Sequence, residues 1–322
     1  MTKNKLITLF TIAIIFLFSH IQTVTASTSL SIDPPIVRIQ VKPGKAITKA
    51  FTIQNRSDQE KQLIVRLAPF SESDKFGNPI VDLKNTSPLQ KYFSLSNTDI
   101  KFNEPFTIKP DNSQQIVLSL SIPETADLED SYFNLLVSTY DNSLPSQSPN
   151  TSVSSTIGAN LLISVTSELN PKTILKINNI QITSKNYLKL GKYIIVDSLS
   201  PLTFQISATN NGQFITETKG TISISKGIET TSIQGILPQY IIKKSTRQLL
   251  NLEGNTQFSF TPNPLTIGWY QINTHIKSDN TNSNNSTDIF ILPGKLILAL
   301  ILAIVIIRLI TKSRRTIDSD IS

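Results

Sequence analysis

Apolar and polar residues alternate with a period of two along most of this chain. The clearest stretch is residues 116–122, in which isoleucine or leucine occupies every second position. Similar alternation recurs in four later stretches: 204–208, 222–224, 258–260 and 270–276. Successive side chains of a strand point to opposite faces of the sheet, so this pattern predicts half-buried β-strands. Between residues 27 and 292 no window of helical length keeps a period of 3.6.

One stretch differs because it carries bulky residues on both of its faces. Residues 132–140 place tyrosine or leucine on one face and Phe133, Leu135 and Val137 on the other. A strand with two apolar faces is covered on both sides. We therefore expect this strand at the centre of a sheet.

Turn-forming residues interrupt these strands at short intervals. Proline, glycine and asparagine gather at 42–44, 77–79, 110–112 and 210–212. Many short alternating strands separated by such turns predict an antiparallel sandwich. The expected fold is all-β, with two tandem immunoglobulin-like antiparallel sandwiches followed by a single C-terminal transmembrane helix.

The polar segment 167–171, which ends in proline, divides the predicted strands into two groups. We expect a first immunoglobulin-like sandwich over residues 27–167 and a second over residues 172–292, each large enough for its own core. Two low-complexity segments, 141–151 and 279–287, lie between strand signals, and we interpret them as long mobile hairpin loops.

The N-terminus has the order of features of a secretory signal peptide. Two lysines precede an apolar run over residues 6–18, and small residues follow at 24–26. This predicts a signal peptide over residues 1–26, cleaved between Ala26 and Ser27. A retained helix over the run would be only ~20 Å long, short of the ~30 Å hydrocarbon core of a bilayer.

The C-terminus predicts one membrane-spanning helix over residues 293–311. An unbroken apolar run covers residues 296–307, and Lys295 and Arg308 flank it where their charges would reach lipid headgroups. No flexible stalk precedes this run, so we expect the second sandwich to lie close to the membrane and the first to project beyond it.

A basic tail over residues 312–322 follows, with its positive charges on Lys312, Arg314 and Arg315. Basic residues favour the cytoplasmic side of a membrane. The predicted localisation is therefore the cell membrane, single-pass, with the N-terminal ectodomain outside and the C-terminus cytoplasmic.

The basic balance of the chain belongs mainly to its two ends. The formal net charge is +7, from 30 basic and 23 acidic residues. Removing the seven basic and two acidic residues of the targeting and membrane ends leaves 23 basic and 21 acidic residues, a net charge near +2. A nucleic-acid partner would require a clustered basic face, so we expect none.

The residue types exclude several kinds of chemistry. There is no cysteine, which removes disulfides, thiolate metal sites and cysteine nucleophiles. His275 is the only histidine of the predicted mature chain, and no nucleophile motif accompanies it, so we favour a surface histidine over a general base. We assign no catalytic, cofactor-binding or metal residue and expect a protein that is not an enzyme.

Two groups of side chains are candidate ligand sites. One group is acidic and consists of Glu124, Asp127, Glu129 and Asp130. It lacks the spacing and the glycine of a calcium-binding EF-hand loop, so we favour a turn that faces solvent. Calcium binding near Asp127 remains an open alternative. The adjacent pair Trp269 and Tyr270 belongs to a predicted strand, so their side chains point to opposite faces. We expect Tyr270 to face inward and Trp269 to be exposed.

Several short motifs resemble those of a known family. They are Val41-Lys42-Pro43-Gly44 followed by 51–57, the stretch Ile122-Pro123-Glu124-Thr125-Ala126 followed by 132–136, and Gly268-Trp269-Tyr270 near the end of the second half. Together with the order of segments, they resemble the WxL-interacting surface proteins and related bacterial membrane-anchored tandem β-sandwich proteins. The resemblance implies a peptidoglycan-binding domain, a second binding domain, one helix and a basic tail.

The leading functional hypothesis is a membrane-anchored, non-catalytic surface protein of the bacterial envelope that binds wall polymer, such as peptidoglycan, or a partner surface protein. The alternative is a chaperone-like or assembly module of a surface structure, which requires an open sheet edge that can accept a strand. The third choice is a carboxylate-dependent hydrolase, which requires two acidic side chains facing each other in a cleft.

Overall fold

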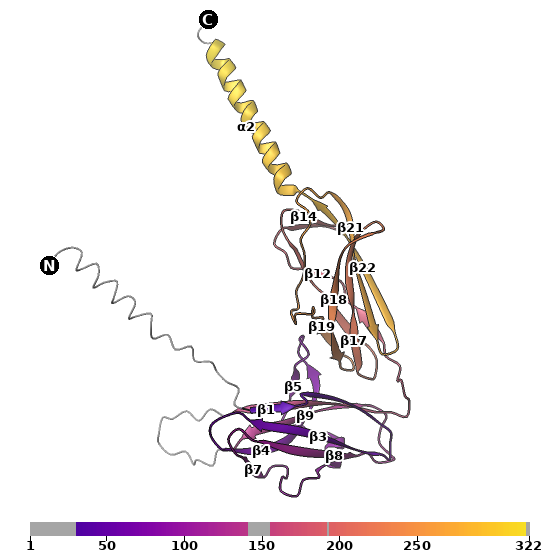
Figure 1. The fold of residues 1–322 in the computed structure, drawn as a ribbon. Helices are drawn as coiled ribbons and strands as arrows, with labels where there is room; N and C mark the ends of the chain where they lie inside the picture. The colour runs from indigo at the N-terminus through magenta and orange to yellow at the C-terminus, as the bar shows by residue number, and fades with distance from the viewer. Residues whose placement is uncertain (1–29, 141–154, 192, 320–322) are drawn as a thin grey trace, which may run out of the picture.

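The computed structural model describes residues 30–140, 155–191 and 193–319, with the side chains of the last helix described as far as Ile310. The predicted signal peptide, including Ala26 and Ser27, and the segment 141–151 lie outside the described residues. The described residues form two β-sandwiches that meet at an angle, and a helix extends from the far end of the second (Figure 1). The all-β, sandwich-rich fold predicted from the alternation is confirmed.

The first sandwich packs two sheets around one apolar core. The four-stranded sheet has the order β1 (Leu30–Asp33), β3 (Ala46–Asn55), β8 (Ser113–Ser121) and β6 (Phe93–Leu95). The facing sheet has the order β2 (Ile36–Val41), β10 (Thr156–Val165), β9 (Asp130–Thr139), β4 (Lys61–Ser73) and β5 (Pro79–Val81), and β7 (Pro105–Ile108) also pairs with β4. A short 3-10 helix, η1 (Pro88–Tyr92), precedes β6.

Two strand predictions for this sandwich are confirmed. Every second residue from Ile116 to Ile122 is buried in the core, as their alternation predicts. Strand β9 lies between β10 and β4, and its residues Phe133, Leu135 and Val137 are fully buried. The bulky residues on both faces of β9 therefore correctly predicted a central strand.

The second sandwich has one large sheet opposite two small ones. The six-stranded sheet has the order β13 (Tyr187–Leu190), β14 (Tyr193–Asp197), β22 (Asn282–Leu292), β21 (Gly268–Ser278), β17 (Thr216–Lys226) and β18 (Glu229–Ile241). The small sheets are β11 (Leu175–Ile177), β16 (Ser207–Asn210) and β19 (Thr246–Gln248), and β12 (Gln181–Ile182), β15 (Leu202–Gln205) and β20 (Phe258–Phe260). A second apolar cluster, separate from that of the first sandwich, fills the space between them.

The prediction of a mobile loop over residues 279–287 is wrong. Strand β22 begins at Asn282 and pairs with β21 from Asn282 to Ile291, so only a tight turn separates the two strands. The polar side chains of β22 bond to backbone carbonyls of the opposite sheet: Ser283 donates to Leu175 at 2.8 Å and Asn285 donates to Asn178 at 3.1 Å. These bonds stabilise a strand whose asparagine-rich composition is typical of loops.

The last strand leads directly into a helix, α2 (Gly294–Ser319), with only Pro293 between them. The absence of a stalk is thus confirmed for the described residues, and the helix continues into the segment assigned to the basic tail. In the part of the chain that the structure describes, no helix has both the length and the apolar character needed to cross a membrane. The predicted helix at 293–311 is present, but the predicted span is not found among these residues.

Candidate binding site at the junction of the sandwiches

A small apolar cluster holds the two sandwiches together. The first sandwich contributes Phe70, Tyr132 and Leu162, and the second contributes Ile215 and Ile242, all of them buried. The rings of Phe70 and Tyr132 stack with their centroids 5.6 Å apart. These residues lie on strands or strand ends of both sandwiches, so the cluster fixes one sandwich against the other.

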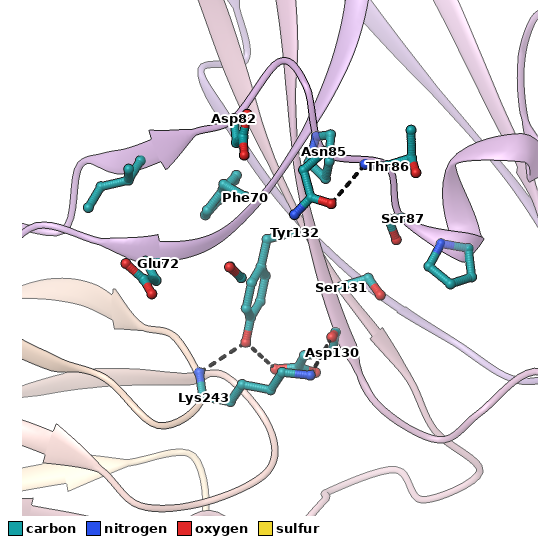
Figure 2. A pocket seen from close by; sticks show the side chains of 14 residues that line it. Phe70, Glu72, Asp82, Asn85, Thr86, Ser87, Asp130, Ser131, Tyr132 and Lys243 are labelled. Atoms are coloured by element: carbon teal, nitrogen blue, oxygen red, sulfur yellow. Dashed lines mark hydrogen bonds between the residues drawn. The ribbon is translucent and has the colours of Figure 1, made fainter.

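A buried polar network lies beside this cluster (Figure 2). The carboxylate of Asp130 accepts a hydrogen bond from the Tyr132 hydroxyl at 2.7 Å and another from the backbone N–H of Ile215. The Tyr132 oxygen in turn accepts from the backbone N–H of Lys243 at 3.0 Å. The Lys243 ammonium donates to the carbonyl of Asp130 at 2.8 Å and to the Glu129 carboxylate at 3.1 Å. The bond between Tyr132 and Asp130 lies within β9, and each of the other bonds joins the two sandwiches.

Burial changes the acid–base behaviour of this network. Asp130 is only 2% exposed, and removal from water raises the pKa of its carboxyl group, although hydrogen bonds from Tyr132 and Ile215 and the charge of Lys243 act in the opposite direction. Burial, together with the nearby Asp130 carboxylate, raises the pKa of the Tyr132 phenol, which therefore stays protonated as a donor.

Three further contacts lie around this network. The Arg38 guanidinium pairs with the Asp279 carboxylate at 2.8 Å. The backbone N–H of Gln248 donates to the carbonyl of Lys75 in the β4–β5 hairpin at 2.7 Å. Gly77 (φ +86°) in the same hairpin allows the guanidinium of Arg247 to approach, because an added Cβ would lie 2.3 Å from its central carbon. The junction is therefore held by contacts on several sides.

A cavity of about 430 Å³ opens at this junction. Its lining combines apolar surface from Phe70, Ile80 and Pro88 with polar groups of Glu72, Asp82 and Lys243 (Figure 2). A volume of this size can accept a side chain or a short segment of a ligand. The cavity therefore has the size and the mixed lining of a binding site.

An open sheet edge lies beside the cavity. Strand β5 is the last strand of its sheet, and within the described residues no strand pairs with its outer side. Ile80 in this strand is 53% exposed and Leu83 just beyond it is 65% exposed. Leu83 also lines a second cavity, of about 550 Å³, together with Arg66, Gln90 and Phe102. Apolar side chains thus follow the open edge from one cavity to the next.

The four acidic residues of the candidate calcium site do not converge on one point. Asp130 is used in the junction, Glu129 pairs with Lys243, and the side chains of Glu124 and Asp127 are exposed. Within the described residues, no three histidine, cysteine, aspartate or glutamate side chains form a group suited to a metal ion. The calcium alternative near Asp127 therefore gains no support from the positions of these side chains.

The remaining sequence candidates lie away from the junction. His275 is exposed on β21 with its ring beside the Asn284 side chain, which confirms a surface histidine. Trp269 is 51% exposed and Tyr270 is buried, as predicted. The Lys295 ammonium lies 3.4 Å from the Asp197 carboxylate and 2.9 Å from the Ser200 hydroxyl.

Of the residues flanking the predicted membrane helix, Arg308 lies within α2. The side chains of Lys312, Arg314 and Arg315 lie outside the described residues.

The sequence did not identify the junction network. Asp130 and Tyr132 are two positions apart on one strand, so they share a face, and this spacing was the one available signal. Their partner Lys243 lies more than a hundred residues later, with no motif to link it to them. Only the packing of one sandwich against the other brings the three together.

Comparisons with known proteins do not assign a family. No family model matches the chain, and no curated protein matches it. Among solved structures, it is similar to the CsuC–CsuE chaperone–tip adhesion subunit pre-assembly complex from the Csu pili of Acinetobacter baumannii (13% identity, 82% of this chain and 99% of that one, TM-score 0.36). It is also similar to the E. coli chaperone DraB (13% identity, 81% and 96% covered, TM-score 0.34) and to a PapD-like domain of human CEP192 (12% identity, 46% and 95% covered, TM-score 0.30). A TM-score below 0.5 does not establish a shared fold, and no function follows from it.

Proposed function

We propose that this chain is a non-catalytic assembly or chaperone-like module of a cell-surface structure, which binds a partner polypeptide at the junction of its two sandwiches. The observation that carries the proposal is the open edge of β5 beside a cavity with a mixed lining, between two sandwiches tied together. Wall polymer is the competing ligand.

An extended polypeptide suits this site better than a rigid small molecule. An open strand edge offers backbone N–H and C=O groups to an added strand, while alternate side chains of that strand enter neighbouring pockets. Here the edge of β5 carries exposed Ile80 and lies between two cavities. Strand β5 has three residues, begins with Pro79 and pairs with β4 through a bulge between Phe70 and Glu72, so an added strand would bond to few positions of this edge and would depend on the neighbouring cavities for its side chains.

A retention experiment with matched variants tests this proposal. The full chain in detergent is immobilised and exposed separately to surface extract of the source cells and to purified wall polymer. We compare the parent chain with Ile80→Asp, which places a charge on the open edge, and with Ile233→Asp, a control at a similarly exposed isoleucine of the second sandwich. A protein retained by the parent and by the control but lost with Ile80→Asp supports the proposal. Retention of wall polymer alone, or protein retention that Ile80→Asp leaves unchanged, contradicts it.

We also propose that the chain is attached to a membrane through the apolar residues of α2. The large apolar side chains from Leu296 to Ile310 are all exposed, by 42% to 63%, and they surround the helix on every side. A helix that is apolar all round requires cover by lipid or protein. We expect the full chain to float with lipid vesicles in a density gradient and a chain ending at Leu292 not to float. Equal flotation of both chains would contradict attachment through α2.

A further inference from the structure

Several exposed apolar side chains of the second sandwich lie at the end from which α2 begins. Six of them are at least 42% exposed: Tyr187, Leu188, Ile228, Leu265, Ile267 and Trp269. They come from segments that are far apart in the sequence, namely strand β13, the β17–β18 turn, the loop that enters β21, and the start of β21 itself. Large apolar patches on soluble surfaces mark interaction sites, so this group, which we call the apolar collar, requires a partner.

Strand register locates the apolar collar at the end from which α2 begins. Trp269 pairs with Phe290 and Gly268 with Ile291, immediately before the strand ends at Leu292. On the other side of β22, Val196 pairs with Ile291, and Tyr187 pairs with Val196 in the next strand. Figure 1 likewise places β14 and the start of α2 at the same end of the sandwich.

The distance along the sheet fits a membrane interface. At about 3.3 Å per residue, Trp269, level with Phe290, lies roughly 10–13 Å along the strand from the first residue of α2. The headgroup region on each side of a bilayer is about 5–8 Å thick, so an interfacial position of Trp269 requires β22 to be inclined to the bilayer normal, which brings its residues closer to the membrane than this length along the strand. Ile267 and Leu265 precede Trp269 in the loop and lie nearer the helix end of the sheet.

The aromatic residues of this end form a connected group. Trp269 packs edge-on against Phe290 with ring centroids 5.0 Å apart, and Tyr193 lies 5.7 Å from Trp269. Trp269 stays half exposed despite these contacts. Tryptophan and tyrosine are enriched at the boundary between lipid and water, where an apolar ring and a polar edge are both accommodated.

We propose that the apolar collar rests in the headgroup layer of the membrane to which α2 attaches the chain, with Trp269 as its central anchor. This inference rests on the proposed membrane attachment. A lipid surface is the occupant because the apolar collar is continuous with the exposed apolar helix: Tyr187, Leu188 and Leu298 of α2 line one shared cavity of about 310 Å³. Lys226 also lies at this end, where its ammonium donates to the carbonyl of Ile267 at 3.2 Å, and its positive charge suits anionic headgroups.

The single tryptophan of the chain allows a direct test. The full chain is reconstituted into vesicles of phosphatidylcholine and phosphatidylglycerol, with or without bromine on the acyl chains near the headgroups. Emission from Trp269 is expected to fall about twofold in the brominated vesicles, because the ring lies at the interface. The double variant Ile228→Asp/Ile267→Asp places two charges in the apolar collar and is expected to abolish this loss of emission. The control Ile233→Asp, in β18 and five residues after Ile228, should leave the loss of emission unchanged.

The outcomes separate the two proposals. If the chain does not float with the vesicles, membrane attachment fails. If it floats but bromine leaves the emission unchanged, attachment stands and the interfacial position of the apolar collar is overturned. Emission that is shielded from aqueous iodide yet unaffected by bromine indicates a second copy of this chain on the apolar collar and equally overturns a lipid surface.

Discussion

Replacing Tyr132 with phenylalanine is expected to weaken the junction between the sandwiches without disturbing their cores. The ring that stacks on Phe70 is retained, and only the hydroxyl is lost. That hydroxyl donates to the Asp130 carboxylate and accepts from the backbone N–H of Lys243, so both groups lose a partner while buried. A hydrogen bond to a charged group contributes about 1.5–3 kcal/mol and one between neutral groups about 0.5–1.5 kcal/mol. The expected loss is therefore about 2–4 kcal/mol.

Urea unfolding of the full chain in detergent measures this loss. Tyr132 belongs to β9 of the first sandwich and Trp269 to β21 of the second, so tryptophan fluorescence reports a change that crosses the junction. With a denaturant slope of about 2 kcal/mol per molar urea, the midpoint should fall by about 1–2 M. Tyr187→Phe, at an exposed tyrosine, is the control and should leave the midpoint unchanged. A shift of the Trp269 transition in Tyr132→Phe no larger than in this control would refute the coupling of the sandwiches through Tyr132.

Three further predictions follow from other features. Burial raises the pKa of Asp130 above its unfolded value near 3.9. The stabilisation that the protonated Asp130 contributes to folding is therefore fully present below about pH 3.9 and is lost as the pH rises through the folded pKa. Urea midpoints measured between about pH 3 and 8 should show this loss in the parent chain, and Asp130→Asn should flatten it. Gly220→Ala should destabilise the second sandwich by about 1–3 kcal/mol in the same assay, because the new Cβ would lie 2.0 Å from the carbonyl oxygen of His275, and an equal midpoint would contradict the close approach. A chain ending at Leu292 should be a soluble, folded protein with a cooperative thermal transition by circular dichroism, and aggregation without such a transition would show that α2 is needed for folding.

The parts of the fold set by local pattern could be predicted from the sequence. Alternation at residues 116–122 and two apolar faces at 132–140 identified β8 and the central strand β9, and the inward and outward faces at Trp269 and Tyr270 were also correct. The polar half of β22 was missed because its asparagines and serines are stabilised by carbonyl groups of a strand a hundred residues away. The composition of this segment indicates a local preference for loops, whereas hydrogen bonds to residues far away in the sequence stabilise it as a strand.

The candidate site was beyond prediction for a related reason. Phe70, Tyr132 and Ile242 each carry the apolar character of an ordinary core residue, and their sequence does not indicate that they face another sandwich. The open edge of β5 depends on strand order, which a single sequence does not determine. The start of the helix at Gly294, in contrast, follows Pro293 and was predicted within one residue.

The direct connection of β22 to α2 determines how the molecule carries mechanical load. A pull between the helix and the first sandwich enters the second sandwich along β22, which pairs with β21 on one side and runs parallel to β14 on the other. Inter-strand hydrogen bonds lie across the strands, so a force along β22 strains many of them at once in shear and does not open them one after another. Tension at the helix would therefore load the bonds of β22 to both β21 and β14 together, which favours resistance to forced unfolding at the attachment point.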